Sequence, residues 1–143
     1  MFLGEFQHTL DPKGRVILPS TFRDSLKEGL VMTVGLDHCV AVYPESEWES
    51  VVAGLRNLRA TEGRERAFAR MILAYAHQEI PDRQGRVTVP ARLRNYAGLD
   101  RETTVVGNDA RVELWNTEGW QAYRDRAIED FATTDQAFNL GIF

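Results

Sequence analysis

An internal duplication constrains the fold of this chain more than any other feature of its sequence. Residues 11–23 align with residues 82–94 at an offset of 71, and six of the thirteen aligned positions are identical. The alignment continues downstream at an offset of 72, where the pairs are Gly35 with Gly107, Val40 with Val112, Val42 with Leu114, Tyr43 with Trp115, and Trp48 with Trp120. Such a repeat predicts two copies of one supersecondary unit that share a core.

Both copies predict the same order of elements: a tight turn, a short strand, a brief helix, two further strands and a longer helix. Gly14 and Gly85 supply the positive φ that a tight hairpin turn needs. The strands after them, residues 16–18 and 87–89, are apolar and rich in β-branched side chains. A proline ends each strand and is compatible with the start of a helix. The repeated unit is therefore predicted to be a β-hairpin module.

Apolar stripes predict three longer helices. Their members are Trp48, Val51, Val52, Leu55 and Leu58 in the first, Phe68, Met71, Ile72 and Tyr75 in the second, and Trp120, Tyr123, Ala127 and Phe131 in the third. A Ser46-x-x-Glu49 capping box is expected to begin the first helix. The predicted organisation is a first module at 1–60, a connecting helix at 61–76 and a second module at 77–143, in one compact body. Leu140–Phe143 is expected to contact a neighbouring subunit.

Composition excludes several classes of protein. The hydrophobic fraction of 43% is enough for a core without disulfides or metals. No apolar stretch is long enough to span a bilayer, and the first residues do not resemble a secretion signal. Cys39 is the single cysteine and is expected to be buried. We therefore expect a cytoplasmic protein without membrane association.

Motifs of catalysis and cofactor binding are absent from the sequence. There is no phosphate-binding glycine loop and no nucleophile elbow. His8, His38 and His77 are not at metal-ligand spacing with Cys39. We expect no enzymatic activity, no cofactor, no metal and no small-molecule substrate.

The charge is unevenly distributed along the chain. The net charge is −4 and the pI is about 5.4, which disfavours general affinity for nucleic acid. Only two of the 17 basic residues are lysines, Lys13 and Lys27, so the chain is rich in arginine. Arginine suits bidentate contacts to guanine, phosphate or carboxylate. Four arginines and no acidic residue lie between Arg83 and Arg94.

These residues resemble those of the MraZ family of bacterial transcriptional regulators. The resemblance rests on the opening Met-Phe-Leu-Gly-Glu-Phe, on the stretch from Asp11 to Pro19 and on its second copy, and it covers essentially the whole chain. It implies an α+β fold of the swapped-hairpin group typified by AbrB: a tandem, pseudo-symmetric β-barrel core with short helices and longer packing helices. It also implies a ring-shaped homo-oligomer, associated with the nucleoid. The implied target is repeated double-stranded DNA upstream of the chain's own gene, in the division and cell-wall gene cluster.

The turns are the predicted DNA-binding site. Arg15 and Arg86 follow the turn glycines and could each contact a guanine edge, because the major groove admits a two-stranded ribbon. Asp11 and Asp82 are expected to orient these arginines. The remaining predicted site residues are the turn glycines Gly14 and Gly85 and the candidate phosphate contacts Lys13, Arg23, Arg83, Arg92 and Arg94. The copies differ, since Gln84 stands in place of Lys13 and Arg83 in place of Pro12.

The residues leave other interpretations open. Each Asp-x-x-x-Arg pair could be a surface salt bridge that stiffens its turn, and Arg92 and Arg94 could lie on a solvated helix face. The alternative function is a ring-forming interaction protein whose Arg-rich turns bind an acidic protein partner. An antitoxin-type regulator is a third class, although such proteins usually carry one hairpin per chain and a disordered toxin-binding tail.

Overall fold

The fold, from a computed structural model, is described for residues 1–134, so the predicted contact of Leu140–Phe143 lies outside the described residues. The elements of the first half are β1 (Glu5–Thr9), β2 (Arg15–Ile17), α1 (Ser20–Leu26), β3 (Leu30–Val34), a short 3₁₀ turn (Leu36–His38), β4 (Val40–Pro44) and α2 (Glu45–Arg56). Next come α3 (Gly63–Ala74), β5 (His77–Glu79), β6 (Arg86–Thr88), α4 (Ala91–Ala97), β7 (Glu102–Asn108), β8 (Arg111–Asn116) and α5 (Thr117–Thr133). Apart from α3 and the 3₁₀ turn, the second half repeats the element order of the first.

The two halves exchange strands. The first strand of each half pairs with a strand of the other half, β1 with β7 and β5 with β3, all antiparallel. The second strands, β2 and β6, pair with each other as a separate two-stranded ribbon. Neither half can therefore complete its sheet pairing without the other.

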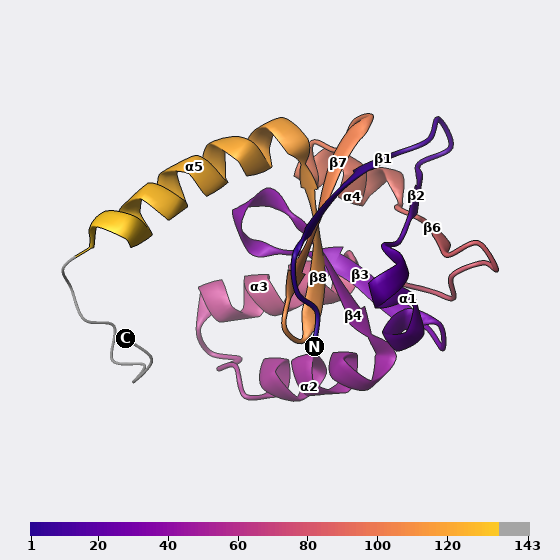
Figure 1. Cartoon of the computed structure of the whole chain (residues 1–143). Coiled ribbons are helices and arrows are strands. Elements are labelled where there is room, and N and C mark those ends of the chain that lie inside the picture. The colour runs from indigo at the N-terminus through magenta and orange to yellow at the C-terminus, as the bar shows by residue number, and fades with distance from the viewer. Residues whose placement is uncertain (135–143) are drawn as a thin grey trace.

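The larger sheet is open. Its strand order is β1-β7-β8-β4-β3-β5, which leaves β1 and β5 at its two edges. The mixed α+β class is as expected, but the predicted closed barrel is not confirmed. The β2–β6 ribbon forms a separate two-stranded sheet to the right of the larger one in Figure 1, and it does not join the edges of the larger sheet.

One core lies between the ribbon and the larger sheet. Equivalent residues of the two halves meet in it, including Val16 with Val87 and Phe22 with Leu93. Phe22 also contacts the rings of Phe2 and Phe6 edge-on, with centroids 5.2 Å apart in both pairs. Because both halves supply this core, burial of apolar surface fixes the ribbon against the sheet.

The short helices begin immediately after the two repeated prolines, whose φ angles near −55° are compatible with a helix start. The capping-box prediction was wrong. Pro44 ends β4 and occupies the N-cap position of α2, and no side chain caps this helix. Ser46 consequently lies inside the first turn rather than before it. Cys39 is buried, as expected.

Figure 1 shows the arrangement that positions the candidate site. The turns before β2 and β6 project to the right, while α5 extends from the opposite side of the sheet toward the upper left. In this view α2 lies below the sheet and α3 lies to the left of its lower part. Within residues 1–134, no helix is both long and apolar enough to cross a membrane.

Candidate nucleic-acid interface

The two turns have nearly the same hydrogen bonds. In the first, the Gly14 N–H donates to the Asp11 carbonyl at 2.9 Å, and the Asp11 N–H donates to the Arg15 carbonyl at 2.8 Å. In the second, the corresponding distances are 2.9 Å from Gly85 to Asp82 and 3.1 Å from Asp82 to Arg86. The φ angles of the two glycines are 79° and 76°, as the turn prediction required.

Each aspartate orients the arginine four residues later. In the first turn Asp11 Oδ1 accepts hydrogen bonds from the backbone N–H groups of Lys13 and Arg15, both at 2.9 Å. Asp11 Oδ2 accepts one from Arg15 Nε at 2.7 Å. The Arg15 backbone N–H and then its guanidinium lower the pKa of Asp11, so the carboxylate stays ionised.

The second turn repeats this arrangement. Asp82 Oδ1 accepts from Gln84 N and Arg86 N at 2.9 Å, and Asp82 Oδ2 accepts from Arg86 Nε at 2.7 Å. The backbone and side-chain donors of Arg86 lower the pKa of Asp82. In both turns the aspartate takes only the Nε edge. Among residues 1–134, neither guanidinium makes a further hydrogen bond through its Nη atoms. The Nη pair of each arginine can therefore bind an external acceptor bidentately.

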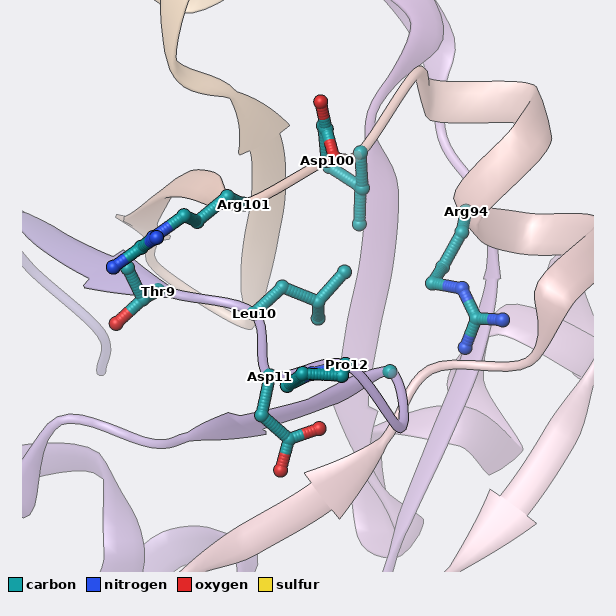
Figure 2. A pocket seen from close by; sticks show the side chains of 9 residues that line it. Thr9, Leu10, Asp11, Pro12, Arg94, Asp100 and Arg101 are labelled. Carbon is teal, nitrogen blue, oxygen red and sulfur yellow. The ribbon is translucent and has the colours of Figure 1, made fainter.

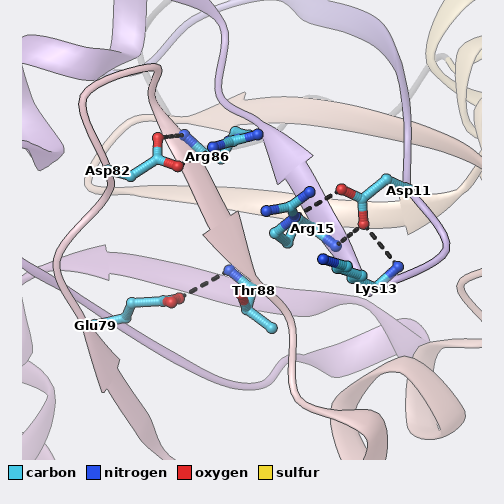
Figure 3. Close-up of polar contacts among 7 residues, drawn as sticks. All are labelled: Asp11, Lys13, Arg15, Glu79, Asp82, Arg86 and Thr88. Carbon is cyan, nitrogen blue, oxygen red and sulfur yellow. Dashed lines mark hydrogen bonds and ion pairs between the residues drawn. The ribbon is translucent and has the colours of Figure 1, made fainter.

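Both arginines lie on the outer face of the β2–β6 ribbon. The register pairs Arg15 with Thr88, Val16 with Val87, and Ile17 with Arg86. The two valines point into the core and are each 1% exposed. Since side chains alternate across a strand, both flanking pairs point outward. In Figure 3 the two arginines lie over one face of the ribbon. Ile17, at 43% exposed, lies between them and is unusual as an outward isoleucine.

The turns are also joined to the ribbon across the boundary between the halves. The Leu18 N–H donates to the Gly85 carbonyl at 2.9 Å, and the Val89 N–H donates to the Gly14 carbonyl at 2.8 Å. Each turn is thus fixed by the strand end of the other half. This geometry gives the ribbon a pseudo-two-fold arrangement, with one Asp–Arg turn at either end.

Arg23 and Arg94 support the turns from beneath. Arg23 Nε donates to the Leu18 carbonyl at 3.0 Å, and Arg94 Nη1 donates to the Val89 carbonyl at 2.8 Å. A Cβ on Gly85 would lie 2.6 Å from Arg23 Nε, and a Cβ on Gly14 would overlap the Arg94 guanidinium. Both contacts are made by flexible arginine side chains, so a Cβ at either position would displace the arginine, and the positive φ is the stricter requirement for glycine.

Hollows lie beside both turns. The one at the first turn has a volume of about 600 Å³ and is lined by Thr9, Leu10, Asp11, Pro12, Gly14, Arg94, Leu99, Asp100 and Arg101. Figure 2 shows Arg94 extending from α4 toward the turn that carries Pro12. The hollow at the second turn, about 230 Å³, is lined by Leu18, Arg23, Asp24, Lys27, Pro81, Asp82, Arg83 and Gly85. Arginine or lysine side chains line both hollows beside the exposed face of the ribbon.

Other predicted site residues are differently placed. Lys13 and Arg83 lie in the turns themselves and are exposed. Arg92 is not brought to the turns: its Nη2 donates to the Ala74 carbonyl at 3.1 Å, and its guanidinium lies 4.2 Å from the Tyr75 ring centroid. It contacts the C-terminal end of α3.

Sequence reasoning missed three parts of this surface. Ile17 and Thr88 were treated only as strand residues, although the alternation around the buried valines points them outward. Glu79 was not among the predicted site residues; it accepts a hydrogen bond from the Thr88 N–H at 3.0 Å (Figure 3), and burial raises the pKa of its carboxyl. The tertiary fold brings Arg101 to the hollow beside the first turn, although it is far from that turn in sequence. No motif or residue spacing in the sequence predicts this position.

Comparison with protein families gives a match in both halves. The family described as "MraZ protein, putative antitoxin-like" matches residues 1–71 and again residues 72–140. This chain belongs to the MraZ family. Curated relatives named "Transcriptional regulator MraZ" align over nearly their whole length. The chain is 45% identical to the one from Micrococcus luteus and 43% identical to the one from Leifsonia xyli subsp. xyli, each over 143 residues and the whole of both chains.

A third relative matches over slightly less of the chain. The relative from Desulforamulus reducens is 46% identical over 131 residues, which cover 92% of each chain. Membership in a family of transcriptional regulators assigns the chain a regulatory, non-enzymatic role.

Proposed function

We propose that this chain is a sequence-specific regulator that binds double-stranded DNA with the outer face of the β2–β6 ribbon. One observation carries the proposal: Arg15 and Arg86 share an exposed ribbon face, each held by an aspartate through Nε with its Nη atoms available. A two-stranded ribbon fits the major groove, where an arginine that contacts O6 and N7 of guanine discriminates by about 1–3 kcal/mol.

The other two outward residues of the ribbon, Ile17 and Thr88, complete the surface proposed to contact the bases. Ile17 offers apolar contact to a thymine methyl group, and the Thr88 hydroxyl can donate to or accept from a base edge. The surface is only pseudo-symmetric, because Ile17 occupies the position that corresponds to Thr88. The two ends of the ribbon are therefore proposed to recognise different bases.

Contacts to phosphate are assigned to the turns and their hollows. Lys13 and Arg83 are exposed beside the reading arginines, and Arg101 and Lys27 line the adjacent hollows. Such contacts fix the register on the duplex without reading its sequence. Arg23 and Arg94 are proposed to act first as supports of Gly85 and Gly14, since each donates to a backbone carbonyl. Arg92 lies apart and is proposed to take no part in binding.

The remaining features follow the family resemblance. On this basis we propose that the chain is cytoplasmic and associated with the nucleoid. We also propose that it assembles into a ring and binds repeats upstream of its own gene in the division and cell-wall gene cluster. Several ribbons in one assembly would raise affinity for repeated sites through effective concentration, commonly by about 10²–10⁴-fold. The strand exchange between halves supports the swapped-hairpin arrangement, with modules at 1–60 and 77–143 and a connecting helix within 61–76.

In the alternative function, the same arginines bind an acidic protein partner instead of DNA. One experiment distinguishes DNA binding from binding of such a partner. Fluorescence anisotropy would compare the duplex upstream of the gene with a shuffled duplex of equal length across a salt series. The proposal expects a preference of more than about tenfold and a steep loss of affinity with salt. Equal weak binding to both duplexes, or no binding at low salt, would exclude sequence-specific regulation by this surface.

A further inference from the structure

A cavity of about 430 Å³ lies between α3 and the face of β4 and β8 that points away from the main core. This volume is within the range of about 300–1,000 Å³ that is usual for small-molecule sites. Four aromatic rings line it: Tyr43 of β4, Phe68 of α3, Tyr75 at the end of α3, and Tyr96 of α4. The cavity therefore has the size and the apolar lining of a ligand site, and none of the ribbon residues proposed to contact bases lines it.

Broken pseudo-symmetry leaves room for this cavity. Gly35 and Gly107 are equivalent positions in the two halves. Beside Gly107 the N-terminal segment fills the space: a Cβ on Gly107 would lie 2.5 Å from the backbone of Leu3, and the Gly107 N–H donates to the Gly4 carbonyl at 2.8 Å. In the first half, β5 pairs with β3 only as far as Met32, and Gly35 lines the cavity. The edge that the second half covers with its own chain therefore borders an open space in the first half.

The loop at the rim of the cavity has an unusual backbone conformation. Asp37 and His38 both have φ of 61°, which is uncommon outside glycine. The Tyr96 hydroxyl donates a hydrogen bond to the Gly35 carbonyl at the start of the loop. Leu36, the next residue, lines the cavity and is 83% exposed. Strain of this kind is concentrated at functional positions such as ligand clamps, and here it places an apolar side chain where it can cover a bound molecule.

Arg111 alone is charged among the described residues that line the cavity. Its Nε and Nη2 atoms each lie 3.0 Å from Oε2 of Glu113, so the ion pair uses this edge of the guanidinium and leaves Nη1 for another acceptor. Glu113 does not line the cavity, and it also accepts hydrogen bonds from the side chains of Asn108 and Trp115. Burial raises the pKa of the Tyr43 hydroxyl, although the nearby charge of Arg111 opposes this, so the hydroxyl stays protonated and can donate. The cavity thus offers two donors to one anionic group.

We infer that this cavity binds a small molecule that carries an aromatic ring and a single carboxylate. The ring packs among the four aromatic side chains in the offset or edge-on arrangements that such rings prefer. The carboxylate accepts hydrogen bonds from Arg111 Nη1 and from the Tyr43 hydroxyl. One arginine whose charge is already partly balanced by Glu113 suits a single negative charge, whereas a phosphate group with nearly two charges would need more donors.

Helix α4 connects the cavity with the first Asp–Arg turn. Tyr96 of α4 lines the cavity, and the Arg92 guanidinium of the same helix lies 4.2 Å from the ring centroid of Tyr75, another lining residue. Arg94, between them in sequence, extends toward the first turn (Figure 2), where its guanidinium lies against Gly14. Because α4 is one short helix, a ligand that displaces Tyr96 or Tyr75 also displaces Arg94. Occupation of the cavity therefore changes the affinity of the ribbon for DNA. This regulatory step rests on the proposed function, whereas binding in the cavity does not.

Isothermal titration calorimetry on the full chain without DNA tests the site. The probes are phenylpropanoate and naphthylacetate, each compared with its neutral amide. Each carboxylate should bind saturably and about tenfold more tightly than its amide, because hydrogen bonds between charged groups are stronger than neutral ones. Arg111→Gln should abolish this preference, since it removes the charge but keeps a donor for Glu113.

A second variant tests the same site at an exposed position. Phe68 is 53% exposed, so Phe68→Glu should leave the fold intact while it adds a negative charge beside the ligand, and it should weaken binding of both carboxylates by at least about tenfold. Leu73→Glu is the matched control, because Leu73 is on the same helix, is 49% exposed and does not line the cavity; it should bind like the parent. Absence of saturable binding, as when a protein partner covers the cavity, would overturn the inference. Equal affinity for carboxylate and amide, or equal loss in the two glutamate variants, would also overturn it.

Anisotropy titrations with the upstream duplex test the regulatory step. Saturating naphthylacetate should change the DNA affinity of the parent by about fivefold or more and leave that of Phe68→Glu unchanged. An unchanged DNA affinity in a protein that binds the probe would overturn the coupling through α4. A protein that binds the probe but shows no preference for the upstream duplex would instead remove the proposed function and leave the ligand site standing.

Discussion

The guanidinium of Arg94, from the second half of the chain, lies against Gly14 in the turn of the first half. A side chain at position 14 would overlap it, and φ of 79° at this position already disfavours any other residue. The reverse contact, Arg23 against Gly85, repeats this relationship at the other end of the ribbon. Turn conformation and the association of the halves are therefore coupled.

Gly14→Ala should destabilise the protein. The left-handed backbone alone costs about 1–2 kcal/mol for alanine, and displacement of Arg94 adds to this. Urea denaturation should show a lower midpoint. Gly54→Ala is the control, because no atom lies within 4 Å of a Cβ built there in α2, and it should raise the unfolding free energy by about 0.5–1 kcal/mol. Equal midpoints for Gly14→Ala and the parent would show that the turn adapts freely.

Arg94→Ala should also lower stability, because it leaves the carbonyl of the buried Val89 without its donor. An unsatisfied buried carbonyl costs about 1–3 kcal/mol, and Arg23→Ala should behave alike through Leu18. Thermal unfolding measures both. If Arg94 were only a phosphate contact, Arg94→Ala would instead keep the melting temperature and reduce the salt dependence of DNA binding.

The Asp11 and Asp82 carboxyls should titrate below their usual value of 3.8. Since the folded-state pKa is lowered, the stabilisation of each turn is complete above that usual value and is lost as the pH falls through the lower, folded-state pKa. Carboxyl chemical shifts measured by NMR report both midpoints. Arg15→Ala should raise the midpoint of Asp11 and leave that of Asp82 unchanged, whereas equal movement of both would contradict independent turns.

Lys13→Gln makes the first turn resemble the second, which carries Gln84. If Lys13 contacts a phosphate, the slope of log affinity against log salt should become shallower by about 1, with sequence preference retained. Arg56→Gln on α2 is a control that should leave the slope unchanged. An unchanged slope for Lys13→Gln would remove this residue from the interface.

The Asp–Arg turns could be predicted from the sequence because their contacts are local. An aspartate, a glycine and an arginine at fixed spacing define the turn, and duplication showed that the arrangement occurs twice. Strand exchange could not be derived from periodicity, since β2 satisfies the same pattern whether it pairs within its own half or with β6. Only the family resemblance pointed to it.

The support role of Arg23 and Arg94 was missed for a related reason. Both were interpreted as phosphate contacts from their charge, whereas each reaches a turn of the opposite half. The capping-box prediction was wrong because Pro44 occupies the N-cap position of α2, so that Ser46 lies within the first turn. The outward direction of Ile17 depends on the buried pair Val16 and Val87, which became evident only with the ribbon register.

The most direct test of the central claim compares an Arg15→Ala/Arg86→Ala double variant with Arg92→Ala for binding to the upstream and shuffled duplexes. Arg92 is an exposed arginine that lies away from the ribbon. Anisotropy titrations at a fixed salt concentration should show that the double variant loses its preference for the upstream duplex, while Arg92→Ala retains the preference of the parent. A double variant that still prefers the upstream duplex as strongly as the parent would contradict reading by the β2–β6 ribbon.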